Sequence, residues 1–363
     1  MKIACVVGAR PNFMKIAPLL EEMAKYPKLN PILVHTGQHY DYEMSQIFFD
    51  ELKIPKPDVH LGIGSGSHAV QTANIMIAFE KAVDDYKPDL VLVVGDVNST
   101  LACALVASKL CIPIAHVEAG LRSFDKTMPE EINRIVTDVL SDYLFTTTEE
   151  ANENLKREGI AENKIFFVGN IMVDTLLKYK EKAESIPILN ELRLEKNSYV
   201  LMTLHRQASV DIKENLLEIL DAVEKLQSMI KVVLVIHPRT KTRIEDFGLK
   251  EKVSSMNNLM IIKPLGYLSF IGLMKNSKFV LSDSGGMQTE TTVLNIPCLT
   301  MRDNTEMPET VREGTNILVG NNTDTIIQES IKIIEGKAKS GKTPKMWDGR
   351  TSERIVSTIT SIR

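Results

Sequence analysis

A glycine turn followed by a carboxylate is the segment of the chain whose residue types point most directly to chemistry. Ser284, Gly285 and Gly286 follow an apolar run, and Glu290 comes shortly afterwards. Glycines let the backbone approach a ligand, and the free N–H groups at the start of a helix favour an anion such as a pyrophosphate. Glu290 could then accept both hydroxyls of a ribose. The segment predicts a nucleotide site, although Ser-Gly-Gly alone is also typical of an ordinary turn.

Two further carboxylates follow consecutive apolar runs in the first half of the chain. Asp96 comes after the run 90–94, and Glu118 ends the next run in the sequence His116-Val117-Glu118. Neighbouring parallel strands would bring both carboxylates to one crevice, where like charges push one pKa upward and provide an acid and a base. A structural ion pair with a nearby arginine would explain each residue equally well.

Cationic residues are expected at the same edge of the sheet. Arg10 and Lys15 follow the first predicted strand, and Pro11 is well placed at a helix start. Open α/β sheets bind ligands at the carboxyl ends of their strands, so anion binding is favoured over two solvated charges. No G-x-G-x-x-G motif follows this strand, so the fingerprint of an NAD site is absent.

Three other segments carry candidate residues with simpler explanations. Glu130 and Glu131 begin a predicted helix, where the helix dipole alone would favour acids, so one of them could serve only that purpose. His205 follows the apolar run 199–203 and is expected opposite Arg10, in contact with phosphate or the leaving group, or else as a core histidine. The polar loop 302–309 could recognise a base or close over a ligand, with a surface turn as the default.

The elements that must position these residues alternate between strands and helices. This alternation predicts parallel sheets covered by helices on both faces. Strands are expected over 2–7, 31–35, 89–94, 114–117, 143–145 and 164–167, and then over 199–203, 232–236, 260–262, 278–281 and 298–300. Helices are expected over 15–25, 70–86, 99–109, 131–140, 213–227, 323–335 and 352–362.

The two series of strands predict an α/β protein with two Rossmann-like domains facing across a cleft. We expect an N-terminal Rossmann-like domain over 1–168 with the acid/base carboxylates, a C-terminal Rossmann-like domain over 169–345, and a C-terminal helix within 346–363 that packs back. Gly169-Asn170 is the expected hinge. A ligand would lie at the carboxyl ends of both sheets.

The composition limits the possible partners. The chain has 363 residues, 44% of them hydrophobic, and a formal net charge of −4. Without a basic run, neither nucleic acid nor an anionic membrane is an expected partner. No apolar run approaches the roughly 20 residues needed to cross a bilayer, so we expect a cytoplasmic protein. Four isolated cysteines predict buried thiols rather than disulfides or a zinc site.

Taken together, these segments resemble the non-hydrolysing UDP-N-acetylglucosamine 2-epimerase family nearly from end to end. The shared motifs are Gly8-Ala9-Arg10-Pro11 with Lys15, Thr36-Gly37-Gln38-His39, Gly95-Asp96 with Asn98-Ser99, His116 to Arg122, Pro129-Glu130-Glu131 with Asn133-Arg134, Gly169-Asn170, Thr203 to Arg206, Asp283 to Gly286 with Gln288 and Glu290, and Thr305-Glu306 with Pro308-Glu309.

The resemblance implies a glycosyltransferase-B fold in which the C-terminal domain over 169–345 binds UDP. It also implies a homodimer, no metal or redox cofactor, and reversible epimerisation at C2 of a UDP-N-acetylhexosamine. It implies that UDP is eliminated to give a 2-acetamidoglucal and is then added back. It assigns acid/base roles to Asp96, Glu118 and Glu130. The residues that it implies at phosphate, leaving group, ribose or uracil are His205, Arg10, Lys15, Ser284, Gly285, Gly286, Glu290 and Phe270.

The chain departs from typical bacterial members at several positions. Met307 replaces an arginine expected near the nucleotide, and Leu265 stands where glutamine is common. Gln38-His39 leads into Tyr40-Asp41, and Val70-Gln71 lacks the arginine of the bacterial activator site. These departures leave open a UDP-2,3-diacetamido-uronic acid 2-epimerase. The sequence is also compatible with a hydrolysing epimerase, a glycosyltransferase of the same fold and a catalytically silent UDP-sugar binding module.

Overall fold

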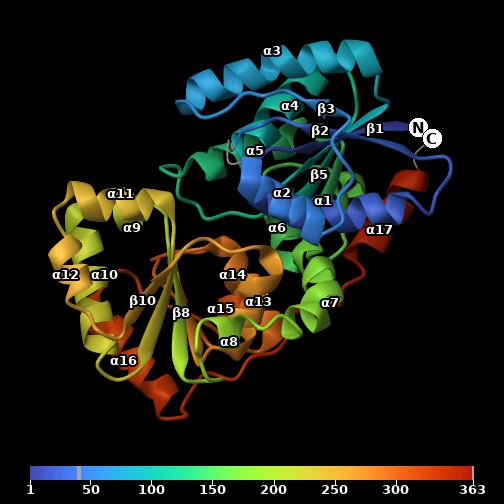
Figure 1. Cartoon of the computed structure of the whole chain (residues 1–363). Coiled ribbons are helices and arrows are strands. Elements are labelled where there is room, and N and C mark those ends of the chain that lie inside the picture. Colours follow the sequence, from blue (N-terminus) through green and yellow to red (C-terminus); the bar gives the residue numbers. More distant parts are fainter. Residues whose placement is uncertain (39–41, 362–363) are drawn as a thin grey trace. The chain divides into compact units, whose positions relative to one another are not determined.

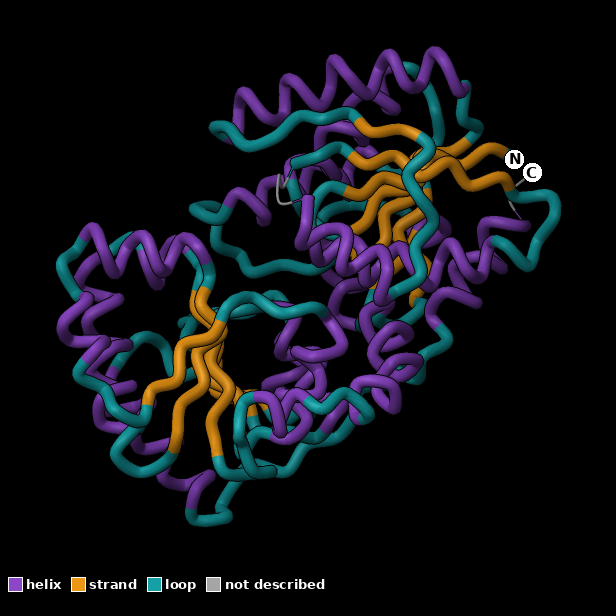
Figure 2. The backbone as a smooth tube through the Cα atoms, viewed as in Figure 1, coloured by secondary structure: helices purple, strands orange, loops and turns teal. Residues whose placement is uncertain are grey.

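The computed structural model describes residues 1–38 and 42–361, and the chain divides into two compact units. The first unit comprises Met1–Lys178 and Lys345–Arg363, and the second comprises Tyr179–Pro344. Each unit is built on a parallel sheet flanked by helices, as Figures 1 and 2 show. The predicted α/β class with two Rossmann-like domains is confirmed.

The first unit contains a seven-stranded sheet in the order β3-β2-β1-β4-β5-β6-β7 within the described residues. Every neighbouring pair in it is parallel. Its strands are β1 (Lys2–Val7), β2 (Asn30–His35), β3 (Val59–His60), β4 (Leu90–Val94), β5 (Ile114–Ala119), β6 (Tyr143–Thr146) and β7 (Ile165–Phe167).

Helices cover this sheet in two groups. The helices α3, α4 and α5 pack against one another, and α1 packs against α2 and α17. The helices of this unit are α1 (Arg10–Met23), α2 (Tyr42–Glu51), α3 (His68–Tyr86), α4 (Asn98–Lys109), α5 (Pro129–Leu140), α6 (Glu149–Arg157), the 3-10 helix η1 (Glu162–Lys164) and α17 (Thr351–Ser361). The helix α7 (Ile171–Glu184) begins in this unit and ends in the second.

The second unit contains a six-stranded parallel sheet in the order β10-β9-β8-β11-β12-β13, again within the described residues. Its strands are β8 (Tyr199–Leu204), β9 (Lys231–Ile236), β10 (Leu259–Ile262), β11 (Phe279–Ser282), β12 (Cys298–Thr300) and β13 (Asn316–Leu318). Its helices are α8 (Ile188–Glu191), α9 (Gln207–Val210), α10 (Lys213–Leu226), α11 (Pro238–Asp246), α12 (Lys250–Ser254), α13 (Tyr267–Asn276), α14 (Gly285–Leu294), α15 (Pro308–Arg312) and α16 (Thr323–Ile334).

The strand order explains where ligand-binding residues are to be expected. The central strands β1 and β4 lie side by side in the first sheet, and the chain proceeds outward from them in opposite directions. The strands β8 and β11 have the same relation in the second sheet. Such a switch point leaves a crevice at the carboxyl ends of the two strands. The segments after β1, β4, β8 and β11 are those in which the sequence predicts the site.

Most predicted elements agree with the structure to within a few residues. The two-residue strand β3 and the three-residue strand β13 were not predicted, whereas β7 and β12, also of three residues, were. The prediction of four buried thiols is wrong for Cys111, which is exposed after α4 in a left-handed conformation (φ +56°). No helix of the described residues is long and apolar enough to cross a membrane.

Candidate active site

Hydrogen bonds of the Asn12 side chain connect the turn after β1 to the end of β4. The side-chain oxygen of Asn12 accepts hydrogen bonds from the backbone N–H groups of Gly8 (3.1 Å) and Ala9 (2.9 Å), and its amide nitrogen donates to the Val94 carbonyl (3.0 Å). This turn leads into α1, whose first residue is the half-buried Arg10. One turn further along, Lys15 is buried and its ammonium group pairs with Glu118.

Glu118 has an unusual backbone conformation. It lies in β5 with φ +74°, and the pairing of β5 with β6 shifts register between Val117 and Ala119. Its side chain is buried, one carboxylate oxygen pairs with Lys15, and the other has no hydrogen-bond partner among the described residues. Left-handed backbone at a residue other than glycine is unfavourable and is concentrated at functional sites. The bulge therefore changes the direction in which the Glu118 side chain leaves β5.

Asp96 and Arg134 form the second ion pair at this edge. Arg134, on α5, is buried, and its guanidinium lies 3.2 Å from the Asp96 carboxylate and 3.0 Å from Glu131. The Asp96 side chain remains 31% exposed, so a ligand could reach it. Asp96 and Glu118 thus each have the cationic partner that a structural role would require. However, Asp96 follows β4 and Glu118 lies near the end of the adjacent strand β5, so both carboxylates are at the same edge of the sheet.

Glu130 and Glu131 are distinguished by their surroundings. Glu131 is buried and accepts hydrogen bonds from the Ser123 backbone N–H and hydroxyl and from the Phe124 backbone N–H. Glu131 is therefore the one that orders the preceding loop. Glu130, at the start of the same helix, is half-buried.

A buried charge network behind these carboxylates includes a residue that the sequence analysis did not identify. The two ring nitrogens of His116 lie 2.6 Å from the Asp138 carboxylate and 2.9 Å from the Gly95 carbonyl oxygen. Arg122 pairs with Asp138 at 2.7 Å. Burial alone would raise the pKa of Asp138, but His116 and Arg122 more than offset this effect, so the pKa lies below its usual value. Asp138 therefore carries its charge in the core.

In the second unit, His205 and Arg206 are held at the end of β8 by a buried aspartate. Asp283 follows β11 and accepts hydrogen bonds from the backbone N–H groups of His205 (2.9 Å) and Arg206 (2.7 Å). The His205 ring also lies 3.0 Å from the Asp283 carboxylate. Burial opposes ionisation of Asp283, but the facing imidazole and the two N–H groups lower its pKa to about 2. The His205 ring is thereby oriented while 38% of its side chain stays exposed.

The predicted phosphate-binding turn lies next to an ionic cluster. Ser284 precedes α14, and Gly285 and Gly286 are its first two residues. A Cβ atom on Gly285 would lie 2.2 Å from a Glu306 carboxylate oxygen, so a larger residue there would have to displace the Glu306 side chain. Glu306 pairs with Arg302 at 2.7 Å and lies 3.5 Å from Arg206.

Glu290 and Phe270 lie on two helices that pack together, α14 and α13. Glu290 is buried, and burial raises its pKa to about 7, with the neighbouring Tyr267 hydroxyl offsetting part of the shift. Phe270 is half-buried. Met307 is buried, and its sulfur accepts a hydrogen bond from Thr289 on α14. Where a cation is common in the family, this chain therefore has a packing residue.

Neither the predicted activator segments around Gln38 and Gln71 nor any metal-ligating group extends this site within the described residues. His39, Tyr40 and Asp41 lie outside the described residues. Gln38 and Gln71 hydrogen-bond with Ser99 and Asn98 inside the first unit. No group of metal-ligating side chains that could hold an ion is found in residues 1–38 and 42–361.

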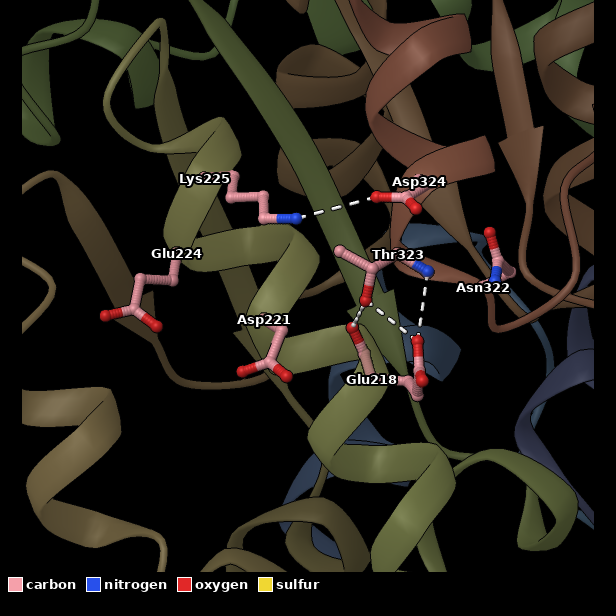
Figure 3. A pocket seen from close by; sticks show the side chains of 7 residues that line it. All are labelled: Glu218, Asp221, Glu224, Lys225, Asn322, Thr323 and Asp324. Carbon is pink, nitrogen blue, oxygen red and sulfur yellow. Dashed lines mark hydrogen bonds and ion pairs between the residues drawn. The ribbon is translucent and has the colours of Figure 1, made fainter.

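A pocket with a volume of about 430 Å³, drawn in Figure 3, contains none of the predicted site residues. It lies at α10 and α16, and Thr323 donates to Glu218 across it. Its lining residues are Glu218, Asp221, Glu224, Lys225, Asn322, Thr323 and Asp324.

Known proteins match the chain along its whole length. The model of the UDP-N-acetylglucosamine 2-epimerase family matches residues 21–360. The chain is 48% identical over 364 residues to a UDP-N-acetylglucosamine 2-epimerase homolog of Methanococcus maripaludis, with 100% of both chains covered. It is 44% identical over 366 residues to the UDP-2,3-diacetamido-2,3-dideoxy-D-glucuronate 2-epimerase of Pseudomonas aeruginosa, again with 100% of both covered.

Solved structures give the same result. The crystal structure of Methanocaldococcus jannaschii UDP-GlcNAc 2-epimerase in complex with UDP-GlcNAc and UDP has a TM-score of 0.94 and 46% identity, with 99% of each chain covered. The resemblance drawn from the sequence motifs is confirmed. The chain belongs to the UDP-N-acetylglucosamine 2-epimerase family of isomerases.

Proposed function

We propose that the protein interconverts UDP-N-acetylglucosamine and UDP-N-acetylmannosamine without hydrolysing them. The observation that carries the proposal is the pair Asp96 and Glu118. Asp96 follows β4 and is held by Arg134, and Glu118 lies near the end of the adjacent strand β5 and is held by Lys15. Family membership and the relative crystallised with UDP-GlcNAc and UDP support the same substrate.

The chemistry explains why such an enzyme needs several acids. The C2 proton of the sugar is not adjacent to a carbonyl group, so simple enolisation is unavailable. In the proposed reaction a base removes the C2 proton, the C1–O bond breaks with both electrons leaving on UDP, and a C1=C2 double bond forms. Protonation of C2 from the opposite face and attack of UDP oxygen on C1 complete the epimerisation. A path of this kind needs carboxylates on both faces of the ring.

We assign the residues as follows. Asp96, Glu118 and Glu130 supply the acid/base groups, and the bulge at Glu118 supports this role because it presents a buried carboxylate with one unbonded oxygen. His205, Arg10 and Lys15 stabilise the charge that develops on the departing pyrophosphate. Lys15 would then contact both Glu118 and the leaving group.

The UDP group is proposed to bind the second unit. Its pyrophosphate would lie at the N-terminal end of α14, where Ser284, Gly285 and Gly286 present backbone N–H groups. Glu290 would accept the ribose hydroxyls, and Phe270 would lie against the uracil. The closeness of Arg206 to Gly285 supports this site, because a guanidinium adds positive charge to the helix terminus.

A second substrate has specific support. The chain is 44% identical to an epimerase named for a UDP-diacetamido-glucuronate, nearly as much as to relatives named for UDP-GlcNAc. Arg302, buried and paired with Glu306, is a cation close to the departure at Met307. This observation keeps a sugar with a carboxylate as the alternative substrate.

We also propose that the protein forms a homodimer through the outer helices of the first unit. Val70 and Ile77 are exposed on α3, as are Ile132 and Val139 on α5, and both helices pack on α4. Each pair is spaced by two helical turns and so forms a stripe. Sedimentation velocity should show a dimer that dissociates in the variant Ile77→Glu with Val139→Glu, and a monomeric parent protein would refute the proposal.

Proton NMR of the protein with UDP-GlcNAc in D2O tests the proposed reaction. We expect UDP-ManNAc to appear with deuterium at C2 and without free sugar. Free ManNAc would instead identify a hydrolysing enzyme. An inert spectrum with UDP-GlcNAc, together with exchange at C2 of the diacetamido-glucuronate, would replace the proposed substrate by the alternative.

A further inference from the structure

We propose that His116 and Asp138 are positioning residues that fix the backbone on which Asp96 and Glu118 are mounted, without touching the substrate themselves. Both side chains are completely buried. The inference rests on the proposed epimerase activity and adds two residues to which no role has been assigned above.

The first step concerns the protons on His116. One ring nitrogen faces the Gly95 carbonyl oxygen at 2.9 Å, and a carbonyl oxygen can only accept a hydrogen bond. The other nitrogen lies 2.6 Å from the Asp138 carboxylate, which also only accepts when it is ionised. Both ring nitrogens therefore face acceptor atoms, and the bond to the Gly95 carbonyl oxygen is one that only the imidazole can donate. A hydrogen bond to an ionised carboxylate is stronger than one between neutral groups, which fixes the orientation of the ring.

The second step concerns Gly95. Its backbone N–H donates to the Val117 carbonyl at 3.0 Å, and its carbonyl accepts from His116, so β5 holds this residue from both sides. Gly95 has φ +69°, and a Cβ atom there would lie 2.8 Å from the Lys15 ammonium. The direction in which Asp96 leaves the sheet is set at this peptide. His116 therefore determines where the Asp96 carboxylate is presented.

The third step concerns the other oxygen of Asp138. It accepts a hydrogen bond from the Gly120 backbone N–H at 3.0 Å, directly after the bulge that carries Glu118. A single carboxylate thus holds both turns, one directly and one through His116. Arg122 pairs with the same carboxylate and connects it to Glu158. Buried charges contribute little net stability compared with apolar packing, so precise geometry is the benefit that we infer.

The test compares two replacements of the imidazole. His116→Leu removes the donor to Gly95, whereas His116→Gln keeps an N–H group that can reach the carbonyl. For His116→Leu we expect kcat to fall by about 100-fold while the Kd for UDP stays within about twofold, because misplacement by an ångström costs about that much. The kcat of His116→Gln should be roughly tenfold higher than that of His116→Leu.

Glu158→Gln is the matched control, because it changes the same network at its partly exposed outer end. Its kcat should stay within about twofold of the parent value even if its melting temperature falls. Asp138→Asn should reproduce the kcat loss. If His116→Leu does not fold, a kcat of His116→Gln or Asp138→Asn equal to that of the parent protein would overturn the inference.

Two further results would also overturn it. One is a loss of kcat in Glu158→Gln as large as that in His116→Leu, and the other is a rise of the UDP Kd in parallel with the kcat loss. Combining His116→Gln with Asp96→Asn should lower kcat no further than Asp96→Asn alone, because the two residues act as one unit. Absence of C2 exchange in the parent protein would remove the proposed function itself, which distinguishes that failure from this one.

Discussion

At the scale of single residues, Glu118 is the position where the structure departs most from ordinary strand geometry. Replacing it by glutamine keeps the size and the contact with Lys15 but removes the group that exchanges a proton. We expect Glu118→Gln to slow epimerisation by at least about 100-fold, the usual contribution of general acid–base catalysis. The affinity for UDP, measured by calorimetry, should remain unchanged.

Asn154→Ala provides a control for this variant, because Asn154 donates to the Gly120 carbonyl in the same loop without carrying charge. Its kcat should stay much closer to that of the parent protein. Turnover by Glu118→Gln at the parent rate would exclude Glu118 as an acid or base.

Glu290 gives a prediction about pH. In the free protein burial raises its pKa to about 7, and the ionised carboxylate is the better acceptor for both ribose hydroxyls because neither of its oxygens carries a proton. Binding should therefore weaken as the pH falls through 7, and near pH 7 it should release protons. Calorimetric titration with UDP-GlcNAc in buffers of different ionisation enthalpy measures both effects, since the diphosphate diester does not titrate in this range.

The variant Glu290→Gln should bind more weakly at pH 8 and should show no proton release. Identical proton release by this variant and the parent protein would assign the titration to another group and remove Glu290 from the ribose site.

Site residues could be predicted from the sequence where one local pattern was sufficient to identify them. Glycines after a strand, and carboxylates at strand ends, are visible in one segment of the chain. The partners of these residues could not be predicted from the sequence. Asp138 and Arg134 lie on a helix well separated in sequence from His116 and Asp96, with which they pair. Only the packing of α5 beside β5 and α4 brings them together.

At the scale of elements, the helix α15 carries Glu309, a buried carboxyl group whose surroundings oppose its ionisation. Neither carboxylate oxygen of Glu309 has a hydrogen-bond partner in the described part of the chain. Burial, with Glu313 and Glu306 nearby, raises its pKa to about 7. The unfolded chain loses this proton near pH 4.5, so between pH 4.5 and 7 the folded state holds the proton more tightly and stability falls as the pH rises. Above pH 7 the folded state carries the full free-energy cost of ionising the buried Glu309 carboxyl group.

Glu309→Gln removes that cost. We expect it to raise the free energy of unfolding by about 3 kcal/mol at pH 8 and by less than about 1 kcal/mol at pH 5. Thermal unfolding at the two pH values measures the difference, with Glu214→Gln on the exposed side of α10 as the control. An equal effect of Glu309→Gln at both pH values would show that its carboxyl group does not titrate as described.

Elements with a strong period were predictable, but length alone did not decide the outcome, because the three-residue strands β7 and β12 were predicted and β13 was not. The strand β4 consists of five buried aliphatic residues, as expected for a parallel strand covered on both faces. Within β5, in contrast, His116 and Glu118 interrupt the apolar pattern, so the predicted strand ended at 117 although it continues to Ala119. The interruption marks the positions that carry the proposed chemistry.

At the scale of the whole molecule, the chain returns to its first unit after completing the second. Trp347 is buried and donates to the Thr147 carbonyl at 3.1 Å, and a Cβ atom on Gly169 would lie 2.1 Å from the Met346 carbonyl oxygen. The returning segment then forms α17, which lies beside α1 (Figure 1). The sequence indicated a final helix, but the partner of such a helix depends on contacts between distant segments.

Asp174 fastens this returning helix to α7. Its carboxylate accepts hydrogen bonds from the backbone N–H groups of Thr351 (3.1 Å) and Ser352 (2.7 Å) and from the Ser352 hydroxyl (2.8 Å). It therefore satisfies the N-terminal N–H groups of α17 from another element. Asp174→Ala leaves these buried donors without an acceptor, which costs about 1–3 kcal/mol for each group. We expect the melting transition of the first unit to fall by several degrees.

Amide hydrogen exchange locates the effect within the molecule. Residues of α17 should lose protection in Asp174→Ala, whereas the strands of the second unit and the Kd for UDP should not change, because the proposed nucleotide site lies in that unit. Glu353→Gln, a change on the surface of α17, should leave protection unaltered. If α17 stays fully protected in Asp174→Ala, then packing against α1 alone holds the C-terminal segment in place.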